Sequence, residues 1–221
     1  INNPNIYSLI ELSLNKFSDK DEIKHQIPHF IFPLVGLYVT SIPRILILLL
    51  NDKYSLNKVI NEINSIDIHN TSELLTTKIY KLPYLRKCIL ETLRLMNPLI
   101  TTFRTLNQDF SFDEKYHFQK DSQFLILNNP VLREKEYFKN PNSFIPERWN
   151  KEMEQSYYAI SFNQGPQRCP AKELVIFLAQ SFIYNFFKMF DSSSIKVETI
   201  DITNVPQIIN PCSVKIKLKK K

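Results

Sequence analysis

The chain has only 2 glycines, Gly36 and Gly165, among its 221 residues. A glycine content of about 7% is usual, so about 15 would be expected. Phosphate-binding loops place two or three glycines within a few positions of one another, so this chain can form neither a dinucleotide-binding fingerprint nor a P-loop. With so few glycines, the role of each remaining one is a question in itself.

The rest of the composition is that of a globular protein with enough chain to bury a core, since 43% of the residues are hydrophobic and 23% are charged. The formal net charge is +6, from 28 basic and 22 acidic residues, and five of the seven residues 215–221 are lysine. The sequence has no second basic stripe, so we do not expect nucleic-acid binding. Three widely spaced cysteines fit neither a disulfide scaffold nor a structural zinc site.

Apolar periodicity and proline positions predict a mainly helical chain with a few short strands. The clearest amphipathic helix spans residues 82–96, with Pro83 in its first turn and Asn97-Pro98 at its end. The other expected elements are helices at 1–21, at 55–65 with Ser55 as N-cap and at 171–190, strands within 99–112, 123–127, 195–202 and 213–218, and a proline-rich loop at 128–150.

Residues 30–50 form the most apolar stretch, with Arg44 as its one charge. The stretch is long enough to cross a bilayer. Pro28, Pro33 and Pro43, together with polar residues near the middle, argue as strongly for a buried central helix. This window alone leaves the membrane span and the central helix equally open.

The segment 162–171 (FNQGPQRCPA) carries the strongest chemical signal. Gly165 and Pro166 predict a tight turn, and Pro170 suits the start of a helix. Cys169 would then face the free N–H groups and positive end of that helix, which favour a thiolate. Cys169 is therefore a candidate nucleophile, redox thiol or metal ligand, against the alternative of a buried inert cysteine. The four scattered histidines provide no partner motif for a Cys–His hydrolase.

The same segment resembles the cysteine-ligand loop of the cytochrome P450 family, which is written F-x-x-G-x-R-x-C-x-G. Phe162, Gly165 and Cys169 match at the family spacing. The arginine position is Gln167 here, with Arg168 one residue later. The last residue of the pattern, a glycine in the family, is an alanine in this chain.

Two further motifs follow the order of the family: residues 91–94 (ETLR) match E-x-x-R on the helix 82–96, and residues 144–149 (FIPERW) resemble F-x-P-E-R-[FW]. The resemblance covers about residues 25–221 and implies a mainly α fold with small β-sheets (α+β), the C-terminal half of the cytochrome P450 fold. We expect one partial domain over 1–221, divided into a central and following helix (22–66), the E-x-x-R helix (82–98), strands and the P-E-R meander (99–150), the cysteine loop and its helix (162–190) and C-terminal strands (195–218).

Glu91 and Arg94 are three residues apart, so they share a helix face and can pair. In the family this pair joins the arginine of the P-E-R segment, here Arg148. The resemblance implies a buried structural triad that holds the meander which presents the cysteine loop. The alternative is a set of solvated surface charges.

The resemblance also implies a haem b cofactor, iron protoporphyrin IX, with Cys169 as the axial ligand of the iron. Phe162 would pack near the ring and Gly165 would form the turn before the ligand. Arg104, in the segment 102–105 (TFRT), is the expected partner of a haem propionate, and Arg168 is a second candidate.

The central helix of the family carries [AG]-G-x-[DE]-T-[TS] where it crosses the haem, and residues 35–41 read VGLYVTS here. Gly36 aligns, which implies close approach of the cofactor to the backbone. Tyr38 takes the acid position and Val39 the threonine position, so the acid–alcohol pair that relays protons to dioxygen is not matched. Thr40 could supply the alcohol if the register shifts by one residue.

These features imply a haem-thiolate monooxygenase that inserts one oxygen atom of O₂ into an apolar small molecule and takes electrons from a reductase or a ferredoxin. Two alternatives stay open: a haem-thiolate isomerase that rearranges peroxides, because such members also lack the acid–alcohol pair, and a truncated haem binder without activity. The resemblance begins near the central helix, so it does not include the family's membrane anchor, much of its substrate pocket or one propionate contact. We therefore expect the chain to be part of a longer product, or to be completed by a separate chain, either of which leaves membrane association through a further N-terminal segment open.

Overall fold

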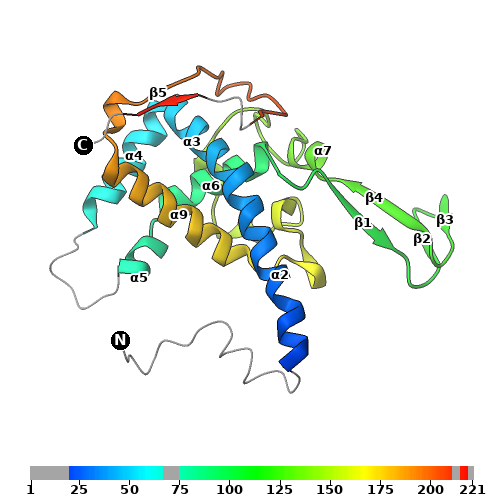
Figure 1. Cartoon of the computed structure of the whole chain (residues 1–221). Coiled ribbons are helices and arrows are strands. Elements are labelled where there is room, and N and C mark those ends of the chain that lie inside the picture. Colours follow the sequence, from blue (N-terminus) through cyan, green and yellow to red (C-terminus); the bar gives the residue numbers. More distant parts are fainter. Residues whose placement is uncertain (1–19, 67–74, 211–214, 219–221) are drawn as a thin grey trace.

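The computed structural model describes residues 20–66, 75–210 and 215–218. The expected fold class is confirmed: the chain is mainly helical with three small two-stranded sheets (Figure 1). In chain order the elements are α2 Lys20–Gly36, the π-helical turn η1 Leu37–Ser41, α3 Ile42–Asn51, α4 Lys53–Ser65, α5 Leu75–Tyr80, α6 Pro83–Leu95, β1 Thr101–Thr105, β2 Phe110–Phe112, β3 Tyr116–Phe118, β4 Gln123–Leu127, α7 Asn128–Leu132, η2 Pro146–Arg148, α8 Lys151–Gln155, η3 Ile160–Phe162, η4 Gly165–Gln167, α9 Lys172–Met189, η5 Ser192–Ser194, β5 Lys196–Val197 and β6 Ile216–Lys217.

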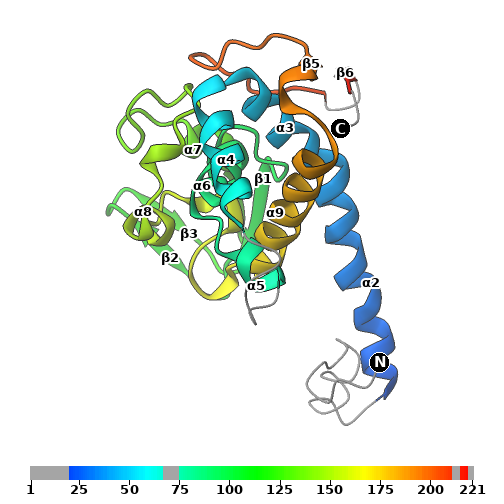
Figure 2. The ribbon, with the colours of Figure 1, turned by 90° about the vertical axis from the view of Figure 1, so that its left-hand side faces the viewer.

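Helix α6 is the centre of the core, with α3, α4 and α9 packed around it (Figure 2). Every residue from Cys88 to Asn97 is buried, charged side chains included. The leucine and isoleucine side chains of α3 and the isoleucine and aromatic side chains of α9 close the same cluster. An element buried on all sides can place polar groups with little freedom, which matters for the site below.

Carboxylates fix the beginnings of α4 and α6. The N-cap of α4 is Asp52, whose side chain accepts hydrogen bonds from the amides of Tyr54 and Ser55, so the expected cap at Ser55 was wrong by one turn. An N-cap side chain must come from the residue before the helix to reach the free amides of the first turn, and Ser55 lies within that turn. Helix α6 begins at Pro83, and the Glu62 carboxylate accepts from the next two free amides, at 2.6 and 2.9 Å.

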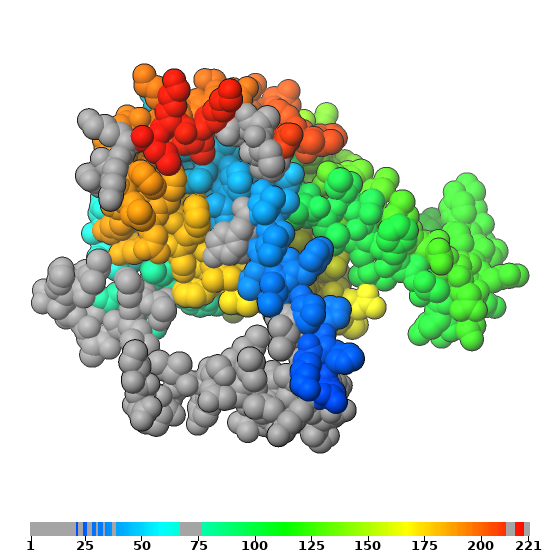
Figure 3. All heavy atoms as spheres, in the orientation of Figure 1, coloured from blue at the N-terminus to red at the C-terminus, as the bar shows by residue number. Residues whose placement is uncertain are grey.

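Strands β1 and β4 pair antiparallel, from Thr101 opposite Leu127 to Thr105 opposite Gln123, and β2 and β3 continue the same ribbon to its tip. Figure 3 shows this ribbon protruding from the helical body. The strands β1, β2 and β4 fall where they were expected, whereas β3 and the short helix α7 were not anticipated. Of the expected C-terminal strands, the described residues form one antiparallel pair of two residues each, β5 and β6, and residues 213–214 lie outside the described part.

The apolar stretch forms one helical run through α2, η1 and α3, prolines included. Its second part belongs to the core, since Ile42 and every residue from Ile45 to Leu49 are buried. The window Leu34–Asn51 has a mean hydropathy of 1.8, is long and apolar enough to cross a membrane, and is 44% buried inside the protein. Both a core helix and a membrane span meet that test of length and composition, and α3 has a packed place among α4, α6 and α9.

Helix α2 and the ribbon carry apolar side chains that the described residues leave exposed. On α2 these include Phe32, which is 81% exposed, and on the ribbon they include Phe103, which is 70% exposed. Helix α9 buries one face, with Ile183 and Phe187, and leaves Leu174 and Met189 exposed on the other. A two-stranded ribbon is marginally stable by itself, and its apolar faces normally pack on a further layer.

Candidate functional site

A closed turn between η3 and α9 presents Cys169. The Cys169 amide donates a hydrogen bond to the carbonyl oxygen of Phe162 at 2.8 Å, which ties the two ends of the turn together. Gly165 has φ +70°, a left-handed conformation that a side chain would strain. This φ angle explains why a glycine occupies position 165. The Cys169 side chain is half-buried and unbridged.

Gln164 braces this turn from within. Its Nε2 donates to the carbonyl oxygens of Ser156 at 3.0 Å and Ala159 at 3.3 Å. These carbonyls lie in the irregular segment between α8 and η3, where the Ser156 carbonyl also accepts from the Ala159 amide at 3.2 Å. One amide side chain therefore fixes the approach to Cys169.

A pocket of about 430 Å³ opens between this turn and the central helix. Cys169 and Phe162 line one side, and Gly36 and Thr40 come from the helical run across it; the remaining lining residues are Ser41, Leu93, Pro98, Leu99, Ser161 and Val175. Sites for small molecules and cofactors have this size and a mainly apolar wall with a few polar groups. Four residues singled out from separate motifs therefore meet in one cavity.

The π-helical turn η1 decides which side chain the central helix offers to this pocket. A π turn inserts extra residues into an α-helix and rotates the following side chains. Thr40 lines the pocket and donates a hydrogen bond to the carbonyl oxygen of Gly36, whereas Val39 is 53% exposed. The alcohol is therefore present one residue beyond the aligned position, while neither Tyr38 nor Val39 supplies an acid.

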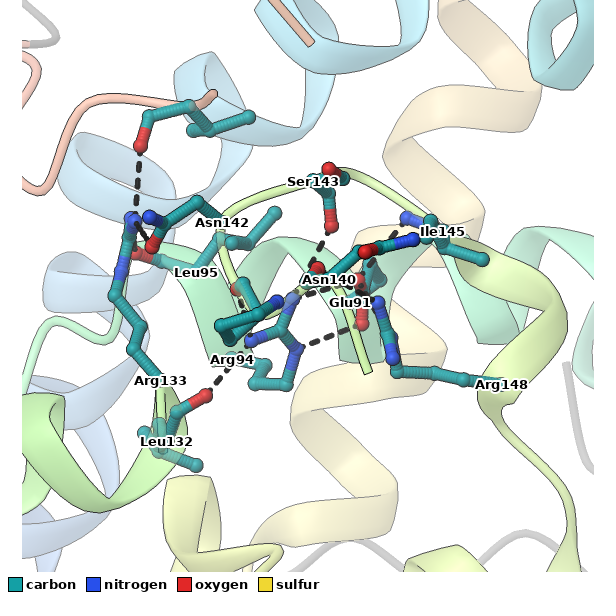
Figure 4. A network of polar contacts seen from close by, with 12 residues as sticks. Glu91, Arg94, Leu95, Leu132, Arg133, Asn140, Asn142, Ser143, Ile145 and Arg148 are labelled. Atoms are coloured by element: carbon teal, nitrogen blue, oxygen red, sulfur yellow. Dashed lines mark hydrogen bonds and ion pairs between the residues drawn. The ribbon is translucent and has the colours of Figure 1, made fainter. Parts of the chain in front are cut away.

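Glu91 lies at the centre of a buried polar network on α6, which Figure 4 shows together with Arg94 and Arg148. Arg94 and Glu91 are both fully buried and form two parallel hydrogen bonds, at 2.8 and 3.0 Å. Arg148 Nε donates to Glu91 Oε1 at 3.0 Å. The structure thus brings the three residues together in a buried cluster rather than leaving them as solvated charges.

The rest of the network reaches the meander through groups that the sequence did not suggest. The Trp149 Nε1–H and the Ile145 amide also donate to the Glu91 carboxylate, at 2.8 and 3.0 Å. Arg94 Nη1 donates to the carbonyl oxygens of Leu132 and Pro141, both at 2.7 Å. The sequence signal for the indole donor was Trp149 itself, the last residue of the P-E-R-W run.

The structure places the two candidate propionate arginines differently. Arg104 lies on β1, two residues beyond Thr102 and on the same strand face, and Thr102 in turn contacts Asn163 of the cysteine turn. Arg104 Nη1 donates to the carbonyl oxygen of Phe103. Arg168 is exposed and lines a separate, more polar hollow together with Gln164 and Cys169. It does not line the apolar pocket.

The other two cysteines have no place in this site. Cys88 is fully buried on α6, and burial raises the pKa of its thiol, which keeps it protonated and inert. Cys212 lies outside the described residues.

The pocket suits a flat apolar cofactor held by sulfur. Its wall offers one soft ligand atom, the Cys169 sulfur, and a Cβ added to Gly36 on the other side would meet nothing within 4 Å. Thiolate ligation is one of the recognised modes of holding haem iron. Among the described residues no group of three or more His, Cys, Asp or Glu side chains could hold a bare metal ion.

Comparison with known proteins gives one consistent answer. The cytochrome P450 family profile matches residues 5–218. The chain is 26% identical to the probable cytochrome P450 49a1 of Drosophila melanogaster over 73% of the chain and 30% of that protein. It is also 26% identical to the 9-divinyl ether synthase of Capsicum annuum over 63% of the chain and 32% of that protein.

The crystal structure of the cytochrome P450DA heme domain superposes on 82% of this chain and 41% of its own, with a TM-score of 0.63 at 17% sequence identity, which shows a shared fold. The chain spans about a third of the length of the curated relatives above. The family profile, which covers nearly the whole chain, and the three ordered motifs agree. The chain belongs to the cytochrome P450 family.

Proposed function

We propose that this chain provides the cysteine side of the haem site in a haem-thiolate monooxygenase that acts on an apolar small molecule. The observation that carries the proposal is the meeting of Cys169 and Thr40 in one mainly apolar pocket. The two residues are 129 positions apart in the sequence, since 169 − 40 = 129, so only the fold brings them together.

Haem b is the cofactor that the pocket and the family support. When bound, it would supply activation of dioxygen at a thiolate-ligated iron. Cys169 would hold the iron through its sulfur, Phe162 would pack against the cofactor near that sulfur, and Gly36 would leave room on the opposite wall of the pocket. Arg104 is the proposed propionate partner, because its strand face is joined to the cysteine turn through Thr102. Arg168 is the weaker candidate.

Thr40 would handle protons in this site. Its hydroxyl already donates to the Gly36 carbonyl, so it can accept a proton or a hydrogen bond from a group in the pocket while its own hydrogen stays directed. A hydroxyl held in this way would orient a proton donor in the pocket by accepting its hydrogen bond, which is a positioning role in acid–base chemistry. The apolar lining of Leu93, Pro98 and Leu99 would hold an apolar substrate and exclude water.

A peroxide-rearranging enzyme is the second candidate, and one observation favours it. The pocket contains the alcohol of Thr40 without a neighbouring acid, because Tyr38 and Val39 occupy the adjacent positions. A relay that lacks its acid delivers protons poorly, which matters for dioxygen activation and much less for rearrangement. A divinyl ether synthase is among the similar proteins.

The bare apolar faces of α2 and the ribbon support a further proposal. Residues outside 1–221, or a separate chain, would cover Phe32 and Phe103 and complete the pocket. Membrane association, if the complete protein has it, is proposed to come from the same covering part. The redox partner is proposed to be a reductase or a ferredoxin for the monooxygenase, and none for the rearranging enzyme.

One spectroscopic experiment tests the shared part of both candidates. The complete protein is reduced and exposed to carbon monoxide, and a red-shifted Soret band typical of thiolate ligation is expected, which Cys169→Ala should abolish. Residues 1–221 expressed alone are the control and should bind no haem. Absence of the band in the complete protein would contradict the haem-thiolate proposal. Oxygen-dependent consumption of NADPH with a reductase, against turnover of a fatty-acid hydroperoxide without one, then separates the two candidates.

A further inference from the structure

The rings of Tyr137 and Tyr158 lie face to face at the surface, with centroids 3.7 Å apart and planes inclined by 13°. Among the ring contacts of the described residues, this is the one that joins two tyrosines. Aromatic pairs usually have centroids about 4.5–7 Å apart, so this stack is unusually close. The separation equals the contact distance of two carbon atoms, about 3.5–4.0 Å, so carbons of the two rings already touch.

The backbone holds both rings in place while leaving them accessible. The Tyr137 amide donates to the Glu134 carbonyl at 3.2 Å, and the next residue, Phe138, is buried. Ala159, which follows Tyr158, is also buried. Tyr137 itself is half-buried and Tyr158 is 42% exposed, so small solutes reach the pair. Two reactive groups held in contact react with each other far faster than with groups that must first meet by diffusion.

The surroundings of Tyr137 also provide acceptors for a phenolic proton. Glu134 and Glu136 are exposed, and the negative charge of Glu136 is the main cause of a raised pKa of the Tyr137 phenol. The phenol is therefore protonated at neutral pH, and its proton must leave together with an electron when the ring is oxidised. A carboxylate beside the ring can take up that proton.

We propose that Tyr137 and Tyr158 form an oxidative modification site, at which one-electron oxidants such as peroxide-derived radicals join the two rings as a dityrosine cross-link. Each phenol gives one electron to an oxidant and one proton to a carboxylate or to water, which leaves two phenoxyl radicals. The radicals form one carbon–carbon bond between ring positions ortho to the oxygens. The hydrogens on those two carbons then move to the oxygens and restore both phenols, so that two electrons and two protons leave in all.

The cross-link would join two segments that the fold places around the cysteine turn. Tyr137 follows α7 in the meander, and Tyr158 lies shortly before Phe162, whose carbonyl oxygen accepts from the Cys169 amide. The two tyrosines are 21 positions apart, since 158 − 137 = 21, so the new bond would close a loop of the meander. The proposal is independent of the function proposed above, because it uses no group of the pocket.

Tyr157 offers a matched control beside the pair. It is 79% exposed, more than Tyr158, and has no ring partner among the described residues. If exposure alone decided the reaction, Tyr157 would be the reactive ring. A phenylalanine at any of these positions keeps the ring and its packing but removes the hydroxyl from which a phenoxyl radical forms.

The test illuminates the complete protein with a ruthenium photo-oxidant and persulfate, which remove electrons one at a time. Dityrosine fluorescence is measured in the monomer band of a denaturing gel, and the cross-link is located by mass spectrometry. Trypsin cuts after Lys139 and Lys151, between the two tyrosines, so the product appears as two joined peptides. At a protein concentration of about 10 µM, a partner on the same chain has an effective concentration in the mM range, so Tyr137→Phe and Tyr158→Phe should each lower the yield about tenfold or more.

Wild type and Tyr157→Phe are expected to give the joined peptides in similar yield. Absence of these peptides from wild type would overturn the proposal, and so would an unchanged yield in Tyr158→Phe. Cross-links found only between chains, or lost in Tyr157→Phe instead, would overturn it as well. The measurement needs no haem, so absence of the carbon monoxide band would contradict the proposed function without affecting this result.

Discussion

The network around Glu91 and the pocket beside Cys169 differ in whether the described chain alone completes them. Glu91 is fully buried, and its carboxylate accepts from four residues of the described chain, so the network is complete within it. The pocket instead has a mainly apolar wall with the half-buried Cys169 side chain on one side, and the proposed cofactor would fill it. A satisfied network holds a shape by itself. A cavity of this size is completed by what binds there.

Glu91→Gln should disrupt the Glu91 network and cause the largest loss of stability among the substitutions proposed here. A glutamine keeps the shape but turns an amide N–H₂ toward donors that had a carboxylate, and leaves the buried Arg94 charge without a counter-charge. The free energy of unfolding of the complete protein is expected to fall by about 3–5 kcal/mol. Urea titration followed by circular dichroism measures it.

Glu147→Gln is the matched control for that substitution. Glu147 also accepts from two side chains, Lys58 and Tyr84, but its side chain is 43% exposed. Exposed ion pairs contribute little, so a loss below about 1 kcal/mol is expected. Equal losses in the two variants would mean that the buried network does not hold the meander in place.

The same contrast explains what the sequence could predict. Helix α6, with its pair Glu91 and Arg94, follows from local periodicity and from a spacing of three on one helix. The turn before Cys169 likewise depends on neighbouring residues, among them Gly165. Helix α7 was missed because Pro130 looked like a loop signal, although proline is tolerated in the first turn of a helix.

Features that depend on residues far apart in the chain were harder to predict. The Trp149 indole meets Glu91 across 58 positions, and no local pattern gives that distance. The π turn η1 was also out of reach, because the same residues fit a regular α-helix with Val39 in the place of Thr40. Only packing of α3 into the core settles that register.

Arg86, Glu154 and Glu173 form an ion-pair cluster that is less buried than the Glu91 network. Substitution of Arg86 should therefore change the free energy of unfolding by an intermediate amount. Arg86 donates to Glu154 at 2.7 and 3.0 Å and to Glu173 at 2.8 and 3.0 Å, joining α6, α8 and α9. Burial alone would raise the pKa of Glu154, but the hydrogen bonds from Arg86 lower it below its usual value. The hydrogen bond from Arg86 likewise lowers the pKa of Glu173.

A carboxyl group whose pKa is lower in the folded state stabilises the fold above its unfolded pKa, and this contribution disappears as the pH falls through the folded value. Arg86→Gln should therefore lower the free energy of unfolding by about 1 kcal/mol at neutral pH, since Glu173 is half-exposed. The difference from wild type should shrink below pH of about 4.3. Urea titrations across this range measure it, and a difference that grows in acid would contradict the assignment.

Cys169→Ser should have the smallest effect on folding and separates holding a shape from holding a ligand. The Cys169 side chain is half-buried, and the amide that closes the turn onto Phe162 remains in the variant, so the free energy of unfolding measured in the absence of haem should change by less than about 0.5 kcal/mol. The red-shifted carbon monoxide band of the complete protein should nevertheless vanish. Cys88→Ser is the reverse control, because a hydroxyl placed in a fully buried apolar position should cost about 1–3 kcal/mol and leave the band in place. The contrary result is that Cys169→Ser destabilises the haem-free fold as much as Cys88→Ser does. That result would mean that Cys169 stabilises the core rather than a ligand, and it would contradict the distinction between the Glu91 network and the pocket.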